Sequence, residues 1–297
     1  MIKDINKTII EIVNLKKSFS MRDAEINVLN GINIKVKQGE FAIIFGPSGC
    51  GKSTLLHCIL GLEPPTTGHV LVEGKDFYKL DEDERALYRR YHVGMVFQQP
   101  LWISALNIVE NVSFPLHLLD LDEKEIFEKA KKNLELVGMD KWADYMPSEL
   151  SGGQQQKVTL ARALSIDPLM IVADEPTGNL DTVSGRELLE TFLKLVDLGK
   201  TLVMVTHDLE YLKYATKIYH MLDGEVVEEI EVDKKNRSKM ILGKKEIGRG
   251  ESNVRSFSKS ASDSSPITAK SAYNKGDACP FENIIRSFAT FFLSCRS

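Results

Sequence analysis

A glycine-rich segment between an apolar run and a helical pattern is the feature that most constrains how this chain folds. Residues 41–45 before it are all apolar, as in a strand buried on both faces, and residues 52–60 after it have a helical pattern. The segment matches the pattern G-x-x-x-x-G-K-[ST] and consists of Gly46, Pro47, Ser48, Gly49, Cys50, Gly51, Lys52, Ser53 and Thr54. A buried strand that leads into a helix through such a loop predicts an α/β fold with a phosphate-binding loop.

The residue types in this loop suit the phosphates of a nucleotide. Glycines allow successive backbone N–H groups to point at an anion, and the N-terminus of the following helix adds its free N–H groups and positive dipole end. Lys52 adds a mobile positive charge toward the β- and γ-phosphates, and Ser53 offers a hydroxyl to Mg²⁺. A chance match is the alternative, but the flanking strand and helix count against it. We therefore predict a nucleotide site in this loop.

Cys50 lies inside the same loop, close to the helix N-terminus and to Lys52. Both features lower the pKa of a thiol. We therefore expect a lowered pKa for Cys50, inactivation of the protein by a maleimide, and protection by bound nucleotide.

Two acids follow a second apolar strand. Residues 169–173 are apolar and lead into Asp174 and Glu175. In parallel α/β sheets, ligands bind at the carboxyl ends of the strands, so Asp174 is expected beside the phosphate loop as a Mg²⁺ ligand, directly or through water. Glu175 is then placed to act as general base on an attacking water. A strand that merely ends in solvated acids is the alternative, and the phosphate loop makes it the weaker one.

A second segment has the residue types of an anion site. Ser151, Gly152, Gly153 and Gln154 precede the helical pattern of residues 157–164. Ser151 is a suitable helix N-cap, and the two glycines let backbone N–H groups approach an anion. A flexible turn before a helix is the other interpretation, and the residue types alone leave both open.

The rest of the chain up to about residue 230 alternates apolar runs with helical patterns, which predicts a mixed α/β domain with a parallel-rich sheet. The net charge of −4 argues against a general nucleic-acid binder, and the apolar runs are too short for a membrane span. The expected strands are 9–15, 32–36, 70–72, 93–97 and 201–205; the expected helices are 81–91, 105–137 and 183–198; Asp223 and Gly224 predict a hairpin turn.

The composition changes near residue 233. A charged stretch and then a serine-rich stretch predict a disordered linker over residues 233–280. Apolar residues at helical spacing in 281–297 predict a short amphipathic helix. Binding to a membrane surface or a partner, docking onto the chain's own domain, and no role at all are the open alternatives for this helix.

Taken together, the motifs resemble those of the ABC-type ATPases over residues 9–227. The phrases at 107–115, 148–156 and 174–181 are typical of the subfamily of macrolide-export, lipoprotein-release and cell-division ATPases. The matching segments are the LSGGQ signature, which is identical at 150–154, Walker A at 46–54, Walker B at 171–175, the Q-loop at 97–99, the D-loop at 178–181 and the H-loop at 205–208.

This resemblance implies a fold and a domain organisation. The fold class is α/β, a P-loop NTPase of the ABC ATPase type with a RecA-like core, an antiparallel β subdomain and an inserted helical subdomain. The ATPase domain is expected over residues 1–232, with the helical subdomain at about 99–160.

The resemblance also implies roles for single residues. Glu175 is implied as the catalytic base, Gln98 as the residue that senses Mg²⁺ and the attacking water, and His207 as a contact of the γ-phosphate. Phe19 is implied to stack on adenine, and Asp181 to cross a dimer interface. The implied ATP-binding residues are Phe19, 46–54 and Asp181, with Ser151, Gly152, Gly153 and Gln154 of a second chain; the implied Mg²⁺ site is Ser53, Gln98 and Asp174.

By the same resemblance, the chain is expected to bind and hydrolyse ATP with Mg²⁺ as a head-to-tail homodimer. Each ATP would lie between the Walker A motif of one chain and the signature of the other. The dimer would power a separate integral membrane permease from the cytoplasmic face of the inner membrane, in export or in extraction of lipoproteins or other lipophilic substrates. The alternative is a cell-division type that signals through a membrane partner without transport. No nucleic-acid partner is expected.

Overall fold

Two β-sheets form the framework of the molecule, and the computed structural model describes residues 7–21 and 24–232 of it. The expected linker at 233–280 and the expected helix at 281–297 lie outside the described residues. The smaller sheet is antiparallel with the strand order β2-β1-β4-β5. Its strands are β1 (Thr8–Met21), β2 (Ala24–Lys37), β4 (Thr67–Val72) and β5 (Lys75–Asp76).

The larger sheet has the order β10-β9-β3-β8-β7-β6. All neighbours pair in parallel except β10, which returns antiparallel to β9 through the turn expected at Asp223 and Gly224. Every residue of β3 is buried, as the unbroken apolar run predicts. The strands are β3 (Phe41–Phe45), β6 (Val93–Val96), β7 (Met170–Asp174), β8 (Thr201–Thr206), β9 (Lys217–Leu222) and β10 (Glu225–Glu231).

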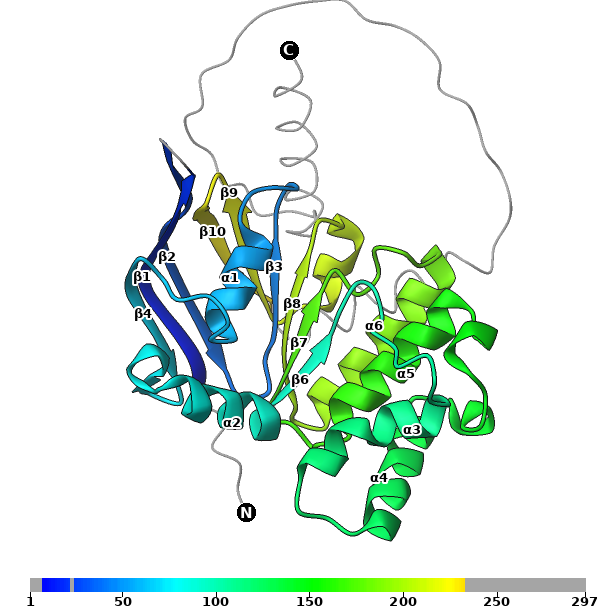
Figure 1. Ribbon diagram of the computed structural model, residues 1–297. Helices are drawn as coiled ribbons and strands as arrows, with labels where there is room; N and C mark the ends of the chain where they lie inside the picture. Colours follow the sequence, from blue (N-terminus) through cyan, green and yellow to red (C-terminus); the bar gives the residue numbers. More distant parts are fainter. Residues whose placement is uncertain (1–6, 22–23, 233–297) are drawn as a thin grey trace, which may run out of the picture. The chain divides into compact units, whose positions relative to one another are not determined.

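Helix α1 (Lys52–Ile59) lies between the two sheets (Figure 1). It buries Leu55, Leu56, Cys58 and Ile59 in one core with residues of β2, β3, β7 and β8. The core therefore holds the N-terminus of α1 in a fixed place beside the carboxyl ends of β3 and β7.

Three helices lie together at one side of the larger sheet: α3 (Ile108–Ser113), α4 (Glu123–Leu136) and α5 (Gly152–Leu164) (Figure 1). Helix α5 also packs against β6 and against α6 (Thr182–Asp197). The charged helix α2 (Glu82–His92) precedes β6 and buries none of its residues. The 3₁₀ helices are η1 (Phe77–Lys79), η2 (Phe114–Leu118), η3 (Asp140–Trp142), η4 (Pro147–Glu149) and η5 (Leu209–Tyr214).

One expected helix and two expected strands differ from the structure. The helical pattern of residues 105–137 is divided into α3, η2 and α4, because Pro115 interrupts the first helix and Asp122 caps the start of the last. The first two strands are longer than expected, because shifts in their register break the alternation from which strands are predicted. Among the described residues, none of the helices has the length and apolar character that crossing a membrane requires.

Candidate nucleotide site

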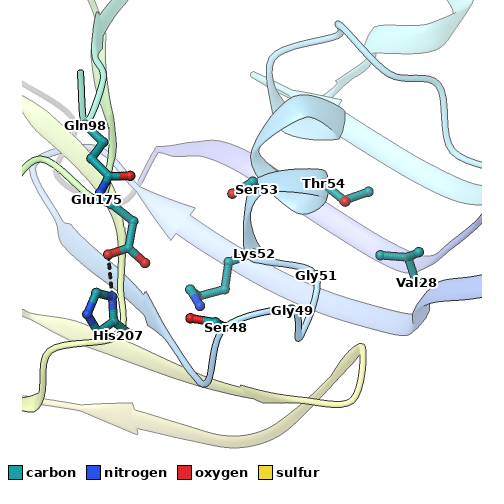
Figure 2. Close-up of a pocket in the computed structure, with 10 residues that line it drawn as sticks. All are labelled: Val28, Ser48, Gly49, Gly51, Lys52, Ser53, Thr54, Gln98, Glu175 and His207. Carbon is teal, nitrogen blue, oxygen red and sulfur yellow. Dashed lines mark hydrogen bonds and ion pairs between the residues drawn. The ribbon is translucent and has the colours of Figure 1, made fainter. Parts of the chain in front are cut away.

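A cavity of about 390 Å³ opens where the phosphate loop faces the ends of β6, β7 and β8 (Figure 2). Residues of the phosphate loop line one side, and polar side chains that follow the three strands line the other. The lining residues are Val28, Ser48, Gly49, Gly51, Lys52, Ser53, Thr54, Gln98, Glu175 and His207. The parallel sheet therefore brings together motifs that are far apart in the sequence.

The phosphate loop is held tightly at both of its ends. A Cβ on residue 46 would lie 2.1 Å from the carbonyl oxygen of Met221, so Gly46 permits direct packing on β9. Gly51 has a φ of 99° and begins α1 against the carbonyl oxygen of Val28. The Nζ of Lys52 donates to the carbonyl oxygens of Gly46 at 2.8 Å and of Pro47 at 2.9 Å. These contacts hold the ammonium group at the loop where phosphates would bind.

The expectation of an acidified thiol at Cys50 is wrong. The side chain is buried, and burial raises the pKa of the Cys50 thiol more than the nearby Lys52 lowers it. Position near a helix N-terminus is visible in the sequence, whereas burial against the neighbouring strands is not. The structure therefore gives no basis for rapid modification of Cys50 by a maleimide.

Asp174 ends β7 with a carboxyl group suited to a cation. Its Oδ1 is buried and has no hydrogen-bond partner among the described residues. Burial and, secondly, the charge of Glu175 raise the pKa of Asp174, whereas His57 and Lys52 lower it. Asp174 is not among the residues that line the cavity. A buried carboxylate oxygen without a partner at the end of β7 nevertheless fits Mg²⁺, which takes one or two carboxylates and completes its shell with phosphate and water oxygens. Within residues 7–21 and 24–232 there is no group of three His, Cys, Asp or Glu that would hold a metal without such help.

Glu175 and His207 form a pair at the edge of the cavity. The Nδ1 of His207 lies 2.6 Å from the Oε2 of Glu175, which fixes the orientation of this carboxylate (Figure 2). Glu175 has a φ of 47°, a region that residues with a side chain rarely adopt. Its N–H donates to the carbonyl oxygen of Val205 at 3.1 Å, and Gly178 N–H donates back to the carbonyl oxygen of Glu175 at 3.0 Å. The acid thus projects from a constrained turn.

Gln98 reaches the cavity from the segment after β6, and its side chain packs against Gly178. A Cβ on residue 178 would lie 2.7 Å from the Nε2 of Gln98, so a side chain there would displace it. The backbone of Gln98 is held by Gln156, a residue that the sequence reasoning missed. Gln156, Leu160 and Ala163 share the buried face of α5, and this spacing is the signal that would have found it.

The signature residues stand apart from this cavity. Ser151 caps α5, since its Oγ accepts from Gln154 N–H at 3.4 Å and its own N–H donates to Gln154 Oε1 at 2.9 Å. Gly152 is exposed, and none of the residues 151–154, which the structure describes in full, lines the cavity. Asp181 caps α6 by accepting from Val183 N–H at 2.9 Å and Ser184 N–H at 3.0 Å. One chain therefore presents, in two separate places, segments with the residue types of an anion site.

Phe19 lies on β1 and is not among the residues that line the cavity. The residue is 36% exposed, and the Nζ of Lys17 lies 4.7 Å from the centroid of its ring. The opposite strand supplies Val28 to the cavity, which the sequence reasoning missed because it began the second strand only at Ile32.

Comparison with known proteins accords with this geometry. Residues 29–178 match the family described as ABC transporter. The chain is 44% identical over 220 residues to an uncharacterized ABC transporter ATP-binding protein of Thermotoga maritima, covering 74% of this chain and 94% of that protein. It is 40% identical over 220 residues to the macrolide export ATP-binding/permease protein MacB of Chlorobaculum tepidum, covering 74% of this chain and 34% of that protein.

The fold is also that of solved structures. The ATP-binding cassette MJ0796 of Methanocaldococcus jannaschii, in a dimeric post-hydrolysis state bound to ADP and Pi, matches with a TM-score of 0.70 and 38% identity. The match covers 75% of this chain and 99% of that one. On its motifs, its fold and these similarities, the chain belongs to the ABC transporter family, as one of its ATP-binding and ATP-hydrolysing cassettes.

Proposed function

We propose that the chain is the subunit that powers a separate membrane permease, in export or in extraction of lipophilic substrates from the inner membrane. The observation that carries this proposal is a cavity of about 310 Å³ beside the segment that holds Gln98, whose lining is largely apolar but includes Arg162. Phe97, which precedes Gln98, lines it, and so do Leu101 and Phe114, which are 64% and 47% exposed. Large apolar side chains left exposed around a hollow are typical of a surface that binds a protein partner.

The site residues have distinct proposed roles in hydrolysis. Lys52 and the backbone N–H groups of the phosphate loop bind the phosphates and stabilise the charge that develops on them. Glu175 accepts the proton of the attacking water, and His207 holds Glu175 in position and contacts the γ-phosphate. Asp174 and Ser53, with Gln98, would hold Mg²⁺, which supplies neutralisation of phosphate charge when bound.

The two separated anion segments support a head-to-tail dimer. The phosphate loop lines the cavity, whereas the exposed N-terminus of α5 at Ser151 lies apart from it. Two chains related by a two-fold axis would each bring their α5 to the cavity of the other, and ATP would lie between them. The dimeric state of the cassette MJ0796 supports the formation of a dimer.

Export is favoured by the similarity to the macrolide export protein MacB. A cell-division type of signalling through a membrane partner is the alternative. A partner with a cavity of substrate size on its outer side would favour transport, and a partner without one would favour signalling.

The permease proposal is tested with the tagged full chain, co-expressed with the membrane proteins encoded beside it and extracted in mild detergent. We expect a membrane protein with several spans to co-purify and to change the ATPase rate. Leu101→Lys should abolish both effects, because it places a second positive charge beside Arg162 in the cavity. Leu198→Lys is the matched control, since Leu198 is 66% exposed and lies outside that cavity. The proposal fails if no membrane protein accompanies the wild-type chain, or if the two variants behave alike.

A further inference from the structure

We propose that Gln156 is a positioning residue that ties the signature helix α5 to the two loops carrying Gln98 and Glu175. The inference rests on the roles proposed above for those two residues. Gln156 lies in α5, two residues after the signature segment 150–154, and is only 2% exposed.

The amide of Gln156 meets three backbone carbonyl groups. Its Nε2 donates to the carbonyl oxygen of Phe97 at 2.7 Å and to that of Pro176 at 2.8 Å, and the carbonyl oxygen of Gln98 lies at 3.3 Å. The two hydrogens of the amide account for the two short bonds. The flipped amide would place Oε1 against three carbonyl oxygens, so the contacts determine which atom faces the loops.

The other end of the same amide shows that this residue does more than fill the core. The Oε1 of Gln156 is buried and has no hydrogen-bond partner among the described residues. An unpaired buried acceptor lowers stability, and an apolar side chain of the same length would avoid that loss. The bonds of this amide to the rest of the described chain are therefore those of its nitrogen to the two loops.

The loop that carries Glu175 has a backbone conformation that its neighbours must stabilise. Glu175 has a φ of 47°, which is disfavoured for a residue with a side chain, so its neighbours must hold it there. The bond from Gln156 to Pro176 anchors the residue that directly follows Glu175. It adds to the bond from Glu175 N–H to Val205 and to the bond from Gly178 N–H to Glu175.

The other loop carries Gln98 into the cavity, and Gln156 binds the carbonyl groups of the two peptides on either side of the Gln98 Cα. A displacement of α5 therefore acts on Gln98 and on Glu175 through one side chain. Because α5 begins at the segment proposed to contact the nucleotide of the second chain, Gln156 connects dimer closure with the placement of the base.

The chain offers a matched control in the next residue along the helix. Gln155 also donates its Nε2 to two carbonyl oxygens, those of Pro147 and Leu150, both at 3.1 Å. Its Oε1 accepts from the Nε1 of Trp102 at 3.0 Å. Gln155→Met therefore removes as many bonds as Gln156→Met, but none to the loops of Gln98 and Glu175.

The experiment compares kcat, KM for ATP and the urea unfolding midpoint of the full-length wild type, Gln156→Met and Gln155→Met. We expect Gln156→Met to lower kcat by about ten- to a hundred-fold, since small misplacements of catalytic groups cost rates of this order, with KM within about two-fold. Gln155→Met should keep most of the wild-type kcat at a comparable unfolding midpoint. Equal losses of kcat in the two variants would overturn the proposal.

Two further outcomes are informative. If Gln156→Met does not fold, Gln156→Asn takes its place, because the amide stays polar but is too short to reach both loops; an unchanged kcat in that variant would overturn the proposal. An inactive wild-type chain would contradict the hydrolytic function itself, whereas an active wild type with equal variants contradicts only the role of Gln156.

Discussion

Asp174 and Glu175 are consecutive carboxylates in the sequence, yet the fold gives them different environments. Asp174 has one buried oxygen without a hydrogen-bond partner in the part of the chain that the structure describes, and burial raises the pKa of Asp174. Glu175 is paired with His207 at the edge of the cavity. A folded pKa above the unfolded value means that the ionised Asp174 lowers stability once the pH rises above its unfolded pKa, and that this penalty is absent at lower pH. The same environment suits a cation that would remove the penalty.

We predict different consequences for the two neutral variants. At pH 7 without metal, Asp174→Asn should raise the melting temperature by about 2 °C, because the buried charge is gone. It should also lose the additional stabilisation that Mg²⁺ gives to the ATP-bound chain.

Glu175→Gln should keep that stabilisation, lose turnover, and accumulate as a dimer in ATP, because binding is retained and only the base is removed.

The stability of Asp174→Asn is measured by thermal unfolding in EDTA and in Mg²⁺-ATP. The turnover and dimerisation of Glu175→Gln are measured by phosphate release and by size-exclusion chromatography in ATP. Stabilisation of Asp174→Asn by Mg²⁺-ATP to the wild-type extent would contradict the metal role of Asp174. Turnover by Glu175→Gln at the wild-type rate would contradict the role of Glu175 as base.

At the scale of elements, the phosphate loop is shaped by two different constraints on its glycines. A Cβ on Gly46 would lie 2.1 Å from a backbone oxygen of β9, so space limits this position. Gly49 has nothing within 4 Å of a built Cβ, but its φ is 84°, so conformation limits this one. The sequence pattern marks both positions as glycine, and only the packing shows that the reasons differ.

We therefore expect Gly46→Ala to destabilise the chain by about 3 kcal/mol or more, since strand or loop must move. Gly49→Ala should cost about 1–2 kcal/mol, the ordinary penalty of a left-handed alanine. Urea unfolding midpoints of the two variants measure the difference, and a larger loss for Gly49→Ala would show that the packing at β9 is not what fixes the loop.

At the scale of the whole molecule, the phosphate loop and the signature segment at the start of α5, which are proposed to form one ATP site from two chains, lie apart within a single chain. Lys52 is in the cavity, and Gly152 lies exposed at the start of α5. A Cβ at residue 152 would meet its first neighbours only at 3.9 and 4.0 Å, so a substitution there leaves the fold intact. The two residues can therefore be inactivated independently.

We predict that Lys52→Ala and Gly152→Asp chains are each inactive alone and regain activity when mixed. In the mixed dimer one site combines both defects and the other has none. With random pairing, half of the dimers are mixed and carry one intact site, which gives about a quarter of the wild-type rate. Phosphate release at equal subunit concentrations measures it. A mixture as inactive as its components would indicate that each chain completes its own site. The control for subunit concentration is a mixture of wild type with the chain that carries both Lys52→Ala and Gly152→Asp.

The sequence by itself determined the local units of this protein and its family. The buried strand β3, the loop and α1 follow from an apolar run, glycines and a helical pattern, because neighbouring residues set those backbone conformations. The ends of β1 and β2 and the division of residues 105–137 were less predictable, because register shifts and caps depend on what packs beside them. The candidate site was largely visible because its residue types are required by phosphate chemistry.

The tertiary structure alone decided which distant residues meet. Gln156 binds carbonyl groups 59 and 20 residues away, and Val28 enters the cavity from a strand of the other sheet. Burial likewise reversed the expected pKa shift of Cys50, although its sequence neighbours favour a thiolate. The physical reason is the same in each case: hydrogen bonds and desolvation act through space, and a sequence pattern reports only on residues that are close along the chain.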